Sequence, residues 1–183
     1  FVATTGDGEE LRAETMILAT GMKYEFPDIP GVAELFGRDA FHCPFCHGWE
    51  ARDGRIGVIV GNTPDAMRAR LIQLWSDQVT VLTHGSDLDA EQLDSLEEAG
   101  IPVVTTEVSS LVVENNSLEA IRFTDGSQTA FDSVMVPITM RHRSNLATRL
   151  GAEVESKPGA FIVDPLKVDF LQKTSVPGLA AAG

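Results

Sequence analysis

The chain has 183 residues, of which 43% are hydrophobic and 22% charged, so it fits one or two folded domains and wholesale disorder is excluded. Its 14 Lys and Arg against 27 Asp and Glu leave a net charge of −13, which argues against nucleic acid or an anionic membrane as partner. Two cysteines are too few for a secreted disulfide framework, and no apolar run approaches the ~20 residues of a membrane span.

The first 31 residues indicate a hairpin, a strand end and a linker. Two strand-like runs, 1–5 and 11–18, flank a Gly-Asp-Gly turn of the kind that joins hairpin strands. The second run closes on Thr20 and Gly21, where small residues let the backbone approach a ligand, or serve only packing at a strand end. Prolines then interrupt regular structure, so residues 24–31 are a candidate linker.

From Arg55 onward the pattern alternates strand and helix. A continuous apolar run over 56–60 predicts a strand that is buried on both faces. Thr63-Pro64-Asp65 predicts a helix start, and that helix should run to about Ser76. A second strand over 79–82, a helix opened by an Asp89–Gln92 capping box and ended by Gly100, and a third strand over 101–105 follow. This order predicts a parallel sheet with right-handed crossovers, as in nucleotide-binding half-domains.

The remaining residues predict a meander and a mixed tail. Strands over 111–113, 118–123 and 129–131 are separated by turns at Asn115-Asn116 and Asp125-Gly126. A strand over 133–137, a helix over 145–150 and a strand over 161–163 complete the chain. The fold class predicted from these elements is α/β.

The strongest chemical signal is the segment 42–50, His-Cys-Pro-Phe-Cys-His-Gly-Trp-Glu. Cys43 and Cys46 are separated by two residues, so they can close a small disulfide ring and reopen it. One thiol of such a pair is acidified to the reactive thiolate by a helix N-terminus or a nearby cation. His47 adjoins Cys46 and can move the proton that thiol–disulfide exchange requires near pH 7.

Three other interpretations of this segment stay open. Zinc could bind through His42, Cys43, Cys46 and His47, although adjacent residues rarely chelate one tetrahedral ion. Cys-x-x-Cys-His is also the attachment string of c-type haem. The simplest alternative is a pair of buried, unreactive thiols.

Four segments stand out in chain order: I-L-A-T-G at 17–21, I-P-G-V at 29–32, C-P-F-C-H-G-W-E at 43–50 and T-S-V-P-G-L-A-A-A-G at 174–183. Together they resemble thioredoxin-reductase-like flavoproteins, which are pyridine nucleotide–disulfide oxidoreductases. The third is most similar to the subgroup that includes low-molecular-weight thioredoxin reductases and the dithiol oxidases of disulfide-containing natural products. The resemblance spans essentially the whole chain.

The resemblance implies a domain organisation. Residues 27–147 would form a three-layer Rossmann-like domain of the NAD(P)-binding type, which carries the cysteine pair. Residues 1–26 and 148–183 would be remnants of an FAD-binding domain, so the chain would be an internal piece of a longer parent. Such a piece is expected to bind FAD poorly and to show no turnover, and the parent is expected to be a cytoplasmic homodimer.

The resemblance also implies roles for individual residues. Cys46 would be the thiol nearest the flavin C4a, Cys43 the thiol that attacks the substrate disulfide, and His47 the acid–base group. Thr20, Gly21 and Gly183 would approach FAD. The implied activity is thiol–disulfide exchange with a thioredoxin-like protein or a small dithiol or disulfide. A flavin dithiol oxidase that uses oxygen is the first alternative, and a non-catalytic binding module is the second.

The expected NAD(P) fingerprint departs from the family pattern. Residues 61–66 are Gly61-Asn62-Thr63-Pro64-Asp65-Ala66, so Thr63 stands at the second glycine position and Ala66 at the third. A side chain at the second position hinders the approach of a pyrophosphate, and Asp65 adds an anion beside it. Residues 81–85 offer neither an acid for a ribose hydroxyl nor arginines for a 2′-phosphate. Ordinary NAD(P)H binding through Gly61, Asn62, Thr63 and Ala66, weak binding, and a different electron source all stay open.

One local basic cluster, Arg141-His142-Arg143, stands out in this acidic chain. It is expected either to meet a phosphate or to form a solvated surface turn.

Overall fold

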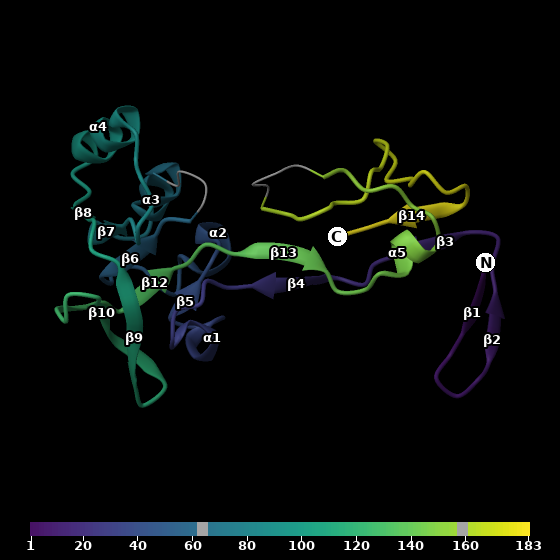
Figure 1. Cartoon of the computed structure of the whole chain (residues 1–183), viewed down its shortest axis with the longest axis horizontal. Helices are drawn as coiled ribbons and strands as arrows, with labels where there is room; N and C mark the ends of the chain where they lie inside the picture. The colour runs from purple at the N-terminus through teal and green to yellow at the C-terminus, as the bar shows by residue number, and fades with distance from the viewer. Residues whose placement is uncertain (62–65, 157–160) are drawn as a thin grey trace. The chain divides into compact units, whose positions relative to one another are not determined.

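The computed structural model describes residues 1–61, 66–156 and 161–183, and it divides the chain into two compact units (Figure 1). The central unit is Phe26–Ile138, and the outer unit combines Phe1–Glu25 with Thr139–Gly183. The outer unit begins again at Thr139, because strand β13 (Thr139–His142) pairs antiparallel with β4 (Met22–Glu25). The second segment of this unit thus begins before residue 148, where the resemblance places the start of an FAD-domain remnant.

A five-stranded parallel sheet lies at the centre of the Phe26–Ile138 unit. Its strands, in spatial order, are β5 (Ala40–Phe41), β12 (Ser133–Met135), β6 (Ile56–Ile59), β7 (Val79–Leu82) and β8 (Val103–Val104). Every neighbouring pair is parallel. All four residues of β6 are buried, as expected for a strand covered on both faces. The predicted parallel α/β sheet is therefore confirmed.

Helices cover one face of this sheet. Helix α3 (Ala66–Ile72) and helix α4 (Ala90–Glu98) contribute Ile72 and Leu96 to the same core as Val58 and Val81 of the sheet. Helix α4 begins as predicted, since Asp89 accepts from the Gln92 backbone N–H at 2.8 Å while the Gln92 side chain accepts from the Asp89 N–H. The predicted helix start at Thr63-Pro64-Asp65 lies outside the described residues.

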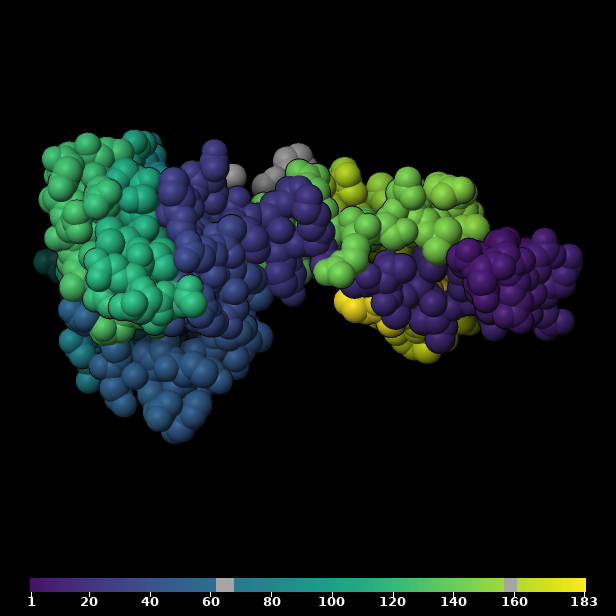
Figure 2. Space-filling view, turned by 90° about the horizontal axis from the view of Figure 1, so that it is seen from below, coloured from purple at the N-terminus to yellow at the C-terminus, as the bar shows by residue number. Residues whose placement is uncertain are grey.

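The predicted meander covers the opposite face. Its strands are β9 (Val108–Glu114), β10 (Ser117–Phe123) and β11 (Gln128–Ala130), paired antiparallel. A Cβ placed on Gly57 of β6 would meet Ile121 and Phe131 at 3.2 and 3.5 Å, so the meander packs directly on the sheet. The unit therefore has the three layers expected for its fold class. Figure 2 shows the segment 26–40 alongside the meander, where the Leu111 N–H donates to the Pro30 carbonyl at 2.9 Å.

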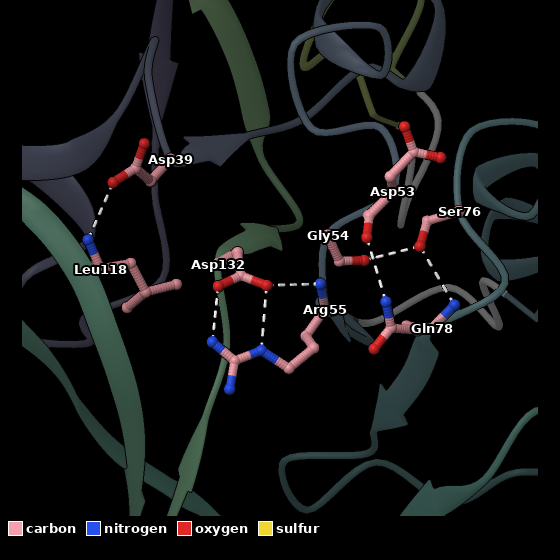
Figure 3. A network of polar contacts seen from close by, with 8 residues as sticks. All are labelled: Asp39, Asp53, Gly54, Arg55, Ser76, Gln78, Leu118 and Asp132. Carbon is pink, nitrogen blue, oxygen red and sulfur yellow. Dashed lines mark hydrogen bonds and ion pairs between the residues drawn. The ribbon is translucent and has the colours of Figure 1, made fainter.

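Polar contacts hold the amino ends of the parallel strands (Figure 3). Arg55, just before β6, donates from its backbone N–H and its Nε to one carboxylate oxygen of Asp132, just before β12, at 2.7 and 2.9 Å. Ser76 donates to the Gly54 carbonyl at 2.6 Å, and Gln78 donates to the Asp53 carbonyl at 3.0 Å. This edge of the sheet is occupied by structural contacts, and the carboxyl edge carries the cysteine pair.

The outer unit is built from short elements. Strands β1 (Val2–Thr4) and β2 (Glu10–Arg12) form the predicted hairpin, while β3 (Met16–Leu18) pairs parallel with β14 (Leu179–Ala181). The single run expected over 11–18 is therefore two strands with different partners. Helix α5 (Leu146–Arg149) matches the predicted helix at 145–150. The strand expected over 161–163 is reduced to one isolated bridge between Ile162 and Met140.

Candidate functional site

The cysteine pair follows the carboxyl end of edge strand β5. Cys43 is the N-cap of helix α2 (Pro44–His47), and α1 (Val32–Leu35) precedes β5 in the same unit. Pro44 occupies the first helical position, where its missing N–H and its fixed φ suit the start of a helix. The backbone N–H groups of Cys46 and His47 both donate to the Cys43 carbonyl at 3.2 Å. This single turn places Cys46 directly over Cys43.

The two sulfur atoms lie 2.6 Å apart as free thiols, and the Cys46 S–H donates to Cys43 Sγ. Cys43 is half-buried and Cys46 is exposed, so the pair is not the buried, inert type. The hydrogen bond to Cys43, with smaller contributions from burial and from the neighbouring charge, raises the pKa of the Cys46 thiol above its usual value. The structure therefore favours a proton on Cys46 beside the Cys43 sulfur.

Two histidines flank the pair in different environments. His47 stacks on Phe41 with ring centroids 6.2 Å apart, and its buried Nδ1 has no hydrogen-bond partner. His42 stacks on Phe36 at 5.8 Å, and its carbonyl accepts from the guanidinium of Arg68. Burial, and then the charges of Arg68 and His47, lower the pKa of His42 below its usual value. The lowered pKa makes the neutral form of His42 the dominant one near pH 7.

An aromatic cluster supports α2, and sequence reasoning missed its role. The predicted helix was expected to run to about Ser76, but α3 ends at Ile72 and Trp75 lies beyond it. Its ring meets that of Trp49 edge-on, with centroids 6.2 Å apart at 81°. The guanidinium carbon of Arg52 lies 4.2 Å from the Trp49 ring centroid. The sequence signal that could have indicated this cluster was the position of Gly48 and Trp49 directly after the cysteine segment.

The outer unit has a pocket of about 140 Å³ that brings together Thr20, Gly21 and Gly183. His142, from the basic cluster singled out in the sequence, also lines it, together with two polar residues that the sequence did not indicate, Ser144 and Gln172. Gly21 has a φ of 73°, and a Cβ there would meet nothing within 4 Å, so its backbone faces open space. The pocket is smaller than the ~300 Å³ at which sites for drug-sized ligands begin.

The expected NAD(P) fingerprint at residues 61–66 is only partly described by the structure. Gly61 follows β6 at the carboxyl edge, whereas Asn62 and Thr63 lie outside the described residues, and Ala66 is the first residue of α3. A Cβ on Gly61 would lie 2.6 Å from Pro137 Cβ, so packing within the protein accounts for this glycine. The described residues therefore show no cradle that only a dinucleotide explains.

The basic cluster is engaged within the outer unit. Arg141 forms an ion pair with Glu25 at 2.6 Å, and Arg143 donates to the Met22 carbonyl at 3.2 Å. The Nε2 of His142 hydrogen-bonds the Asp164 carbonyl at 2.7 Å. The expected solvated turn is in fact strand β13 and the residue after it, held by these contacts.

The described residues include neither a metal-binding cluster nor a membrane-spanning helix. In these parts of the chain, no group of three or more His, Cys, Asp and Glu side chains is arranged to hold a metal ion. Across the same ranges, no helix has the length and apolar character that crossing a bilayer requires.

Comparisons with known proteins complete the description. A relative of 32% identity over 184 residues is the thioredoxin reductase tcpT of Claviceps purpurea, and the match covers 96% of this chain and 56% of that protein. The crystal structure of HlmI superposes with a TM-score of 0.85 at 35% identity, over 100% of this chain and 55% of HlmI. An oxidoreductase from Agrobacterium tumefaciens gives a TM-score of 0.88 at 28% identity, over 100% of this chain and 59% of that one. The chain thus spans somewhat more than half the length of these relatives.

The family model described as pyridine nucleotide-disulphide oxidoreductase matches residues 1–183. The segments on which the resemblance rested are therefore parts of one continuous match. The chain belongs to the pyridine nucleotide–disulphide oxidoreductase family.

Proposed function

We propose that this chain carries the redox-active dithiol of an FAD-dependent thiol–disulfide oxidoreductase. The observation that carries the proposal is the 2.6 Å approach of Cys43 and Cys46, half-buried and exposed, on one turn of helix. His47 follows Cys46 directly in the same helix, and imidazole is the side chain that transfers protons near pH 7, which supports a proton-transfer role. A thioredoxin-like protein or a small dithiol or disulfide is the proposed substrate.

The proposed exchange balances within the dithiol. The Cys43 thiolate attacks one sulfur of a substrate disulfide, the substrate S–S bond breaks, and a mixed disulfide with Cys43 forms as the first substrate sulfur leaves as a thiolate, which takes its proton from solvent. Cys46 loses its proton and attacks Cys43 Sγ, which closes the Cys43–Cys46 disulfide and releases the second substrate thiol. Two electrons pass to the substrate. His47 accepts the Cys46 proton in this direction and returns it in the reverse direction.

The proposed FAD contact lies in the outer unit. Thr20, Gly21 and Gly183 would bind one edge of the cofactor, and their shared pocket supports this assignment. When bound, FAD supplies two-electron exchange with the dithiol. We accordingly assign the unit of residues 1–25 and 139–183 to the FAD-binding domain and residues 26–138 to the domain of NAD(P)-binding type. A homodimeric, cytoplasmic parent stays a prediction from the resemblance.

The test uses the full-length flavoprotein that contains this chain, without oxygen. Dithiothreitol should bleach the flavin absorbance, and Cys43→Ser should abolish that bleaching while flavin remains bound. Flavin-dependent oxidation of NADH or NADPH would then show that electrons flow from the nucleotide through the flavin to the dithiol, as in a reductase. Hydrogen peroxide formed from dithiol and air, with no nicotinamide requirement, would assign the oxidase direction. A colourless full-length protein that takes up no flavin would overturn both assignments.

A further inference from the structure

The carboxyl edge of the parallel sheet, beyond β6, β7 and β8, is where a Rossmann-type domain holds a dinucleotide. The adenine ribose of the nucleotide lies near the end of the second strand, which is β7 here. Arginine or lysine side chains at that point bind a 2′-phosphate, while an acid binds an unsubstituted ribose. The residues after β7 therefore determine which nucleotide this edge accepts.

A carboxylate faces the end of β7. Gly85 has a φ of 80°, and a Cβ on it would lie 2.9 Å from Oε1 of Glu107. Glu107 is exposed and follows β8, so its side chain reaches across from the neighbouring strand end. The imidazole of His84 is engaged, since its Nδ1 accepts the Val108 N–H at 3.1 Å. The group that a 2′-phosphate would meet at this point is an anion.

Protein groups also occupy the neighbouring strand end. Ser86 donates its hydroxyl to the Gly61 carbonyl at 3.1 Å, which joins the end of β7 to the end of β6. Pro137, after β12, fills the space against Gly61. The Gly61 carbonyl and the space beside Gly61 are therefore occupied by groups of the protein itself.

The charge of the surrounding chain has the same sign as Glu107. Residues 71–121 form β7, α4, β8, β9 and part of β10, and they contain ten Asp or Glu and no Lys or Arg. The nearest arginine before that stretch, Arg70, donates to Ser95 at 3.1 Å on the helical side of the sheet. Within residues 71–121, a 2′-phosphate placed here would meet carboxylates and no cationic side chain.

We infer that this domain excludes nucleotides with a 2′-phosphate, NADPH included, and that Glu107 is the residue that sets the exclusion. The inference deepens the proposed function and rests on it, because it concerns the electron source of the same dithiol. With NADPH excluded, electrons enter the Cys43–Cys46 pair from a dithiol substrate or from a nucleotide without the 2′-phosphate.

The test measures binding of adenosine 2′,5′-bisphosphate to the full-length flavoprotein by calorimetry at low salt. The wild type should show no saturable binding up to the highest concentration tested, and Glu107→Arg should show saturable binding with a Kd at least about tenfold below that concentration, because a guanidinium pairs with phosphate. Adenosine 5′-monophosphate, which lacks the 2′-phosphate, should not gain from this change. Glu107→Gln removes the carboxylate with little change in shape and should give a smaller gain in the same direction.

Glu114→Arg is the matched control, because it makes the same change of charge at the other end of β9. It should leave binding of the bisphosphate unchanged. Equal gains from Glu107→Arg and Glu114→Arg would overturn the role of Glu107. Micromolar binding of the bisphosphate by the wild type, or saturable bleaching of its flavin by NADPH, would overturn the exclusion itself.

Anaerobic addition of dithiothreitol to the same preparation separates this inference from the proposed function. If dithiothreitol reduces the flavin and the wild type still binds the bisphosphate, only the exclusion fails. If dithiothreitol leaves the flavin oxidised, the proposed function fails whatever the binding titration gives.

Discussion

Trp75 packs so closely on Gly48 that a Cβ on this glycine would lie 2.3 Å from both Cδ1 and Nε1 of the indole. Gly48 is also the C-cap of α2, where its N–H donates to the Pro44 carbonyl at 2.9 Å. The Trp75 carbonyl in turn accepts the Asp53 N–H at 3.0 Å. The segment after α3 thus anchors the helix that carries the cysteines, and this anchoring explains the glycine in the C-P-F-C-H-G-W-E segment.

Replacing Gly48 with alanine should displace α2. The added methyl group has no space beside the Trp75 indole, so we expect a loss of about 1–3 kcal/mol in the free energy of unfolding. The rate at which the cysteine pair reacts with a chromogenic aromatic disulfide should also change. Gly6→Ala is the control, since a Cβ at Gly6 would meet nothing within 4 Å. Unchanged stability and reactivity in Gly48→Ala would contradict the anchoring role.

The two cysteines should respond differently to serine substitution. Cys43→Ser should abolish exchange with the substrate disulfide, because it removes the attacking sulfur. Cys46→Ser should retain the first step and accumulate an unresolved mixed disulfide on Cys43, which intact-protein mass spectrometry detects. It should also remove any flavin–thiolate absorption in the full-length protein. Full activity in Cys46→Ser, or an adduct on Cys46 in Cys43→Ser, would reverse our assignment of roles.

His42 should make stability fall in mild acid. Burial, Arg68 and His47 lower the pKa of His42 from its ordinary 6.5, so the unfolded chain binds this proton more readily than the folded one. The stabilisation that the folded state gains from neutral His42 is therefore present above about pH 6.5 and is lost as the pH falls below that value. We expect His42→Phe, which keeps a ring against Phe36, to flatten the decline in unfolding free energy between about pH 7.5 and pH 5. If the unfolding free energy falls equally with pH in the wild type and in His42→Phe, His42 is not the cause of the decline.

Asp132 should contribute to stability through Arg55. Hydrogen bonds from Arg55 lower the pKa of Asp132, so the contribution is present above the carboxyl's ordinary value of 3.8 and is lost as the pH falls below it. The side chains of the pair are 46% and 47% exposed, so Asp132→Asn should cost only about 1 kcal/mol at neutral pH. Glu153→Gln, in the more exposed pair with Lys167, is the control and should cost less than about 0.5 kcal/mol. Chemical denaturation compares the two.

Local patterns were sufficient for much of the central unit. The apolar run at 56–60 and the Asp89–Gln92 capping box depend on residues a few positions apart, and both appear where the sequence placed them. The outer unit was harder, because β2 and β3 were expected as one run but pair with strands at opposite ends of the chain. Strand propensity records the fit of a residue to a sheet and carries no information on the partner strand.

The sequence by itself determined the parallel α/β sheet and the adjacency of Cys43 and Cys46. Strand and helix periodicity and the spacing of the two cysteines are local patterns, set by residues a few positions apart. Only the tertiary structure decided what surrounds those features. Trp75 reaches Gly48, and Glu107 reaches Gly85, from segments more than twenty residues away in the sequence. Such contacts arise where strand ends and loops converge at one edge of a sheet, and the order in which strands assemble is a property of the whole fold.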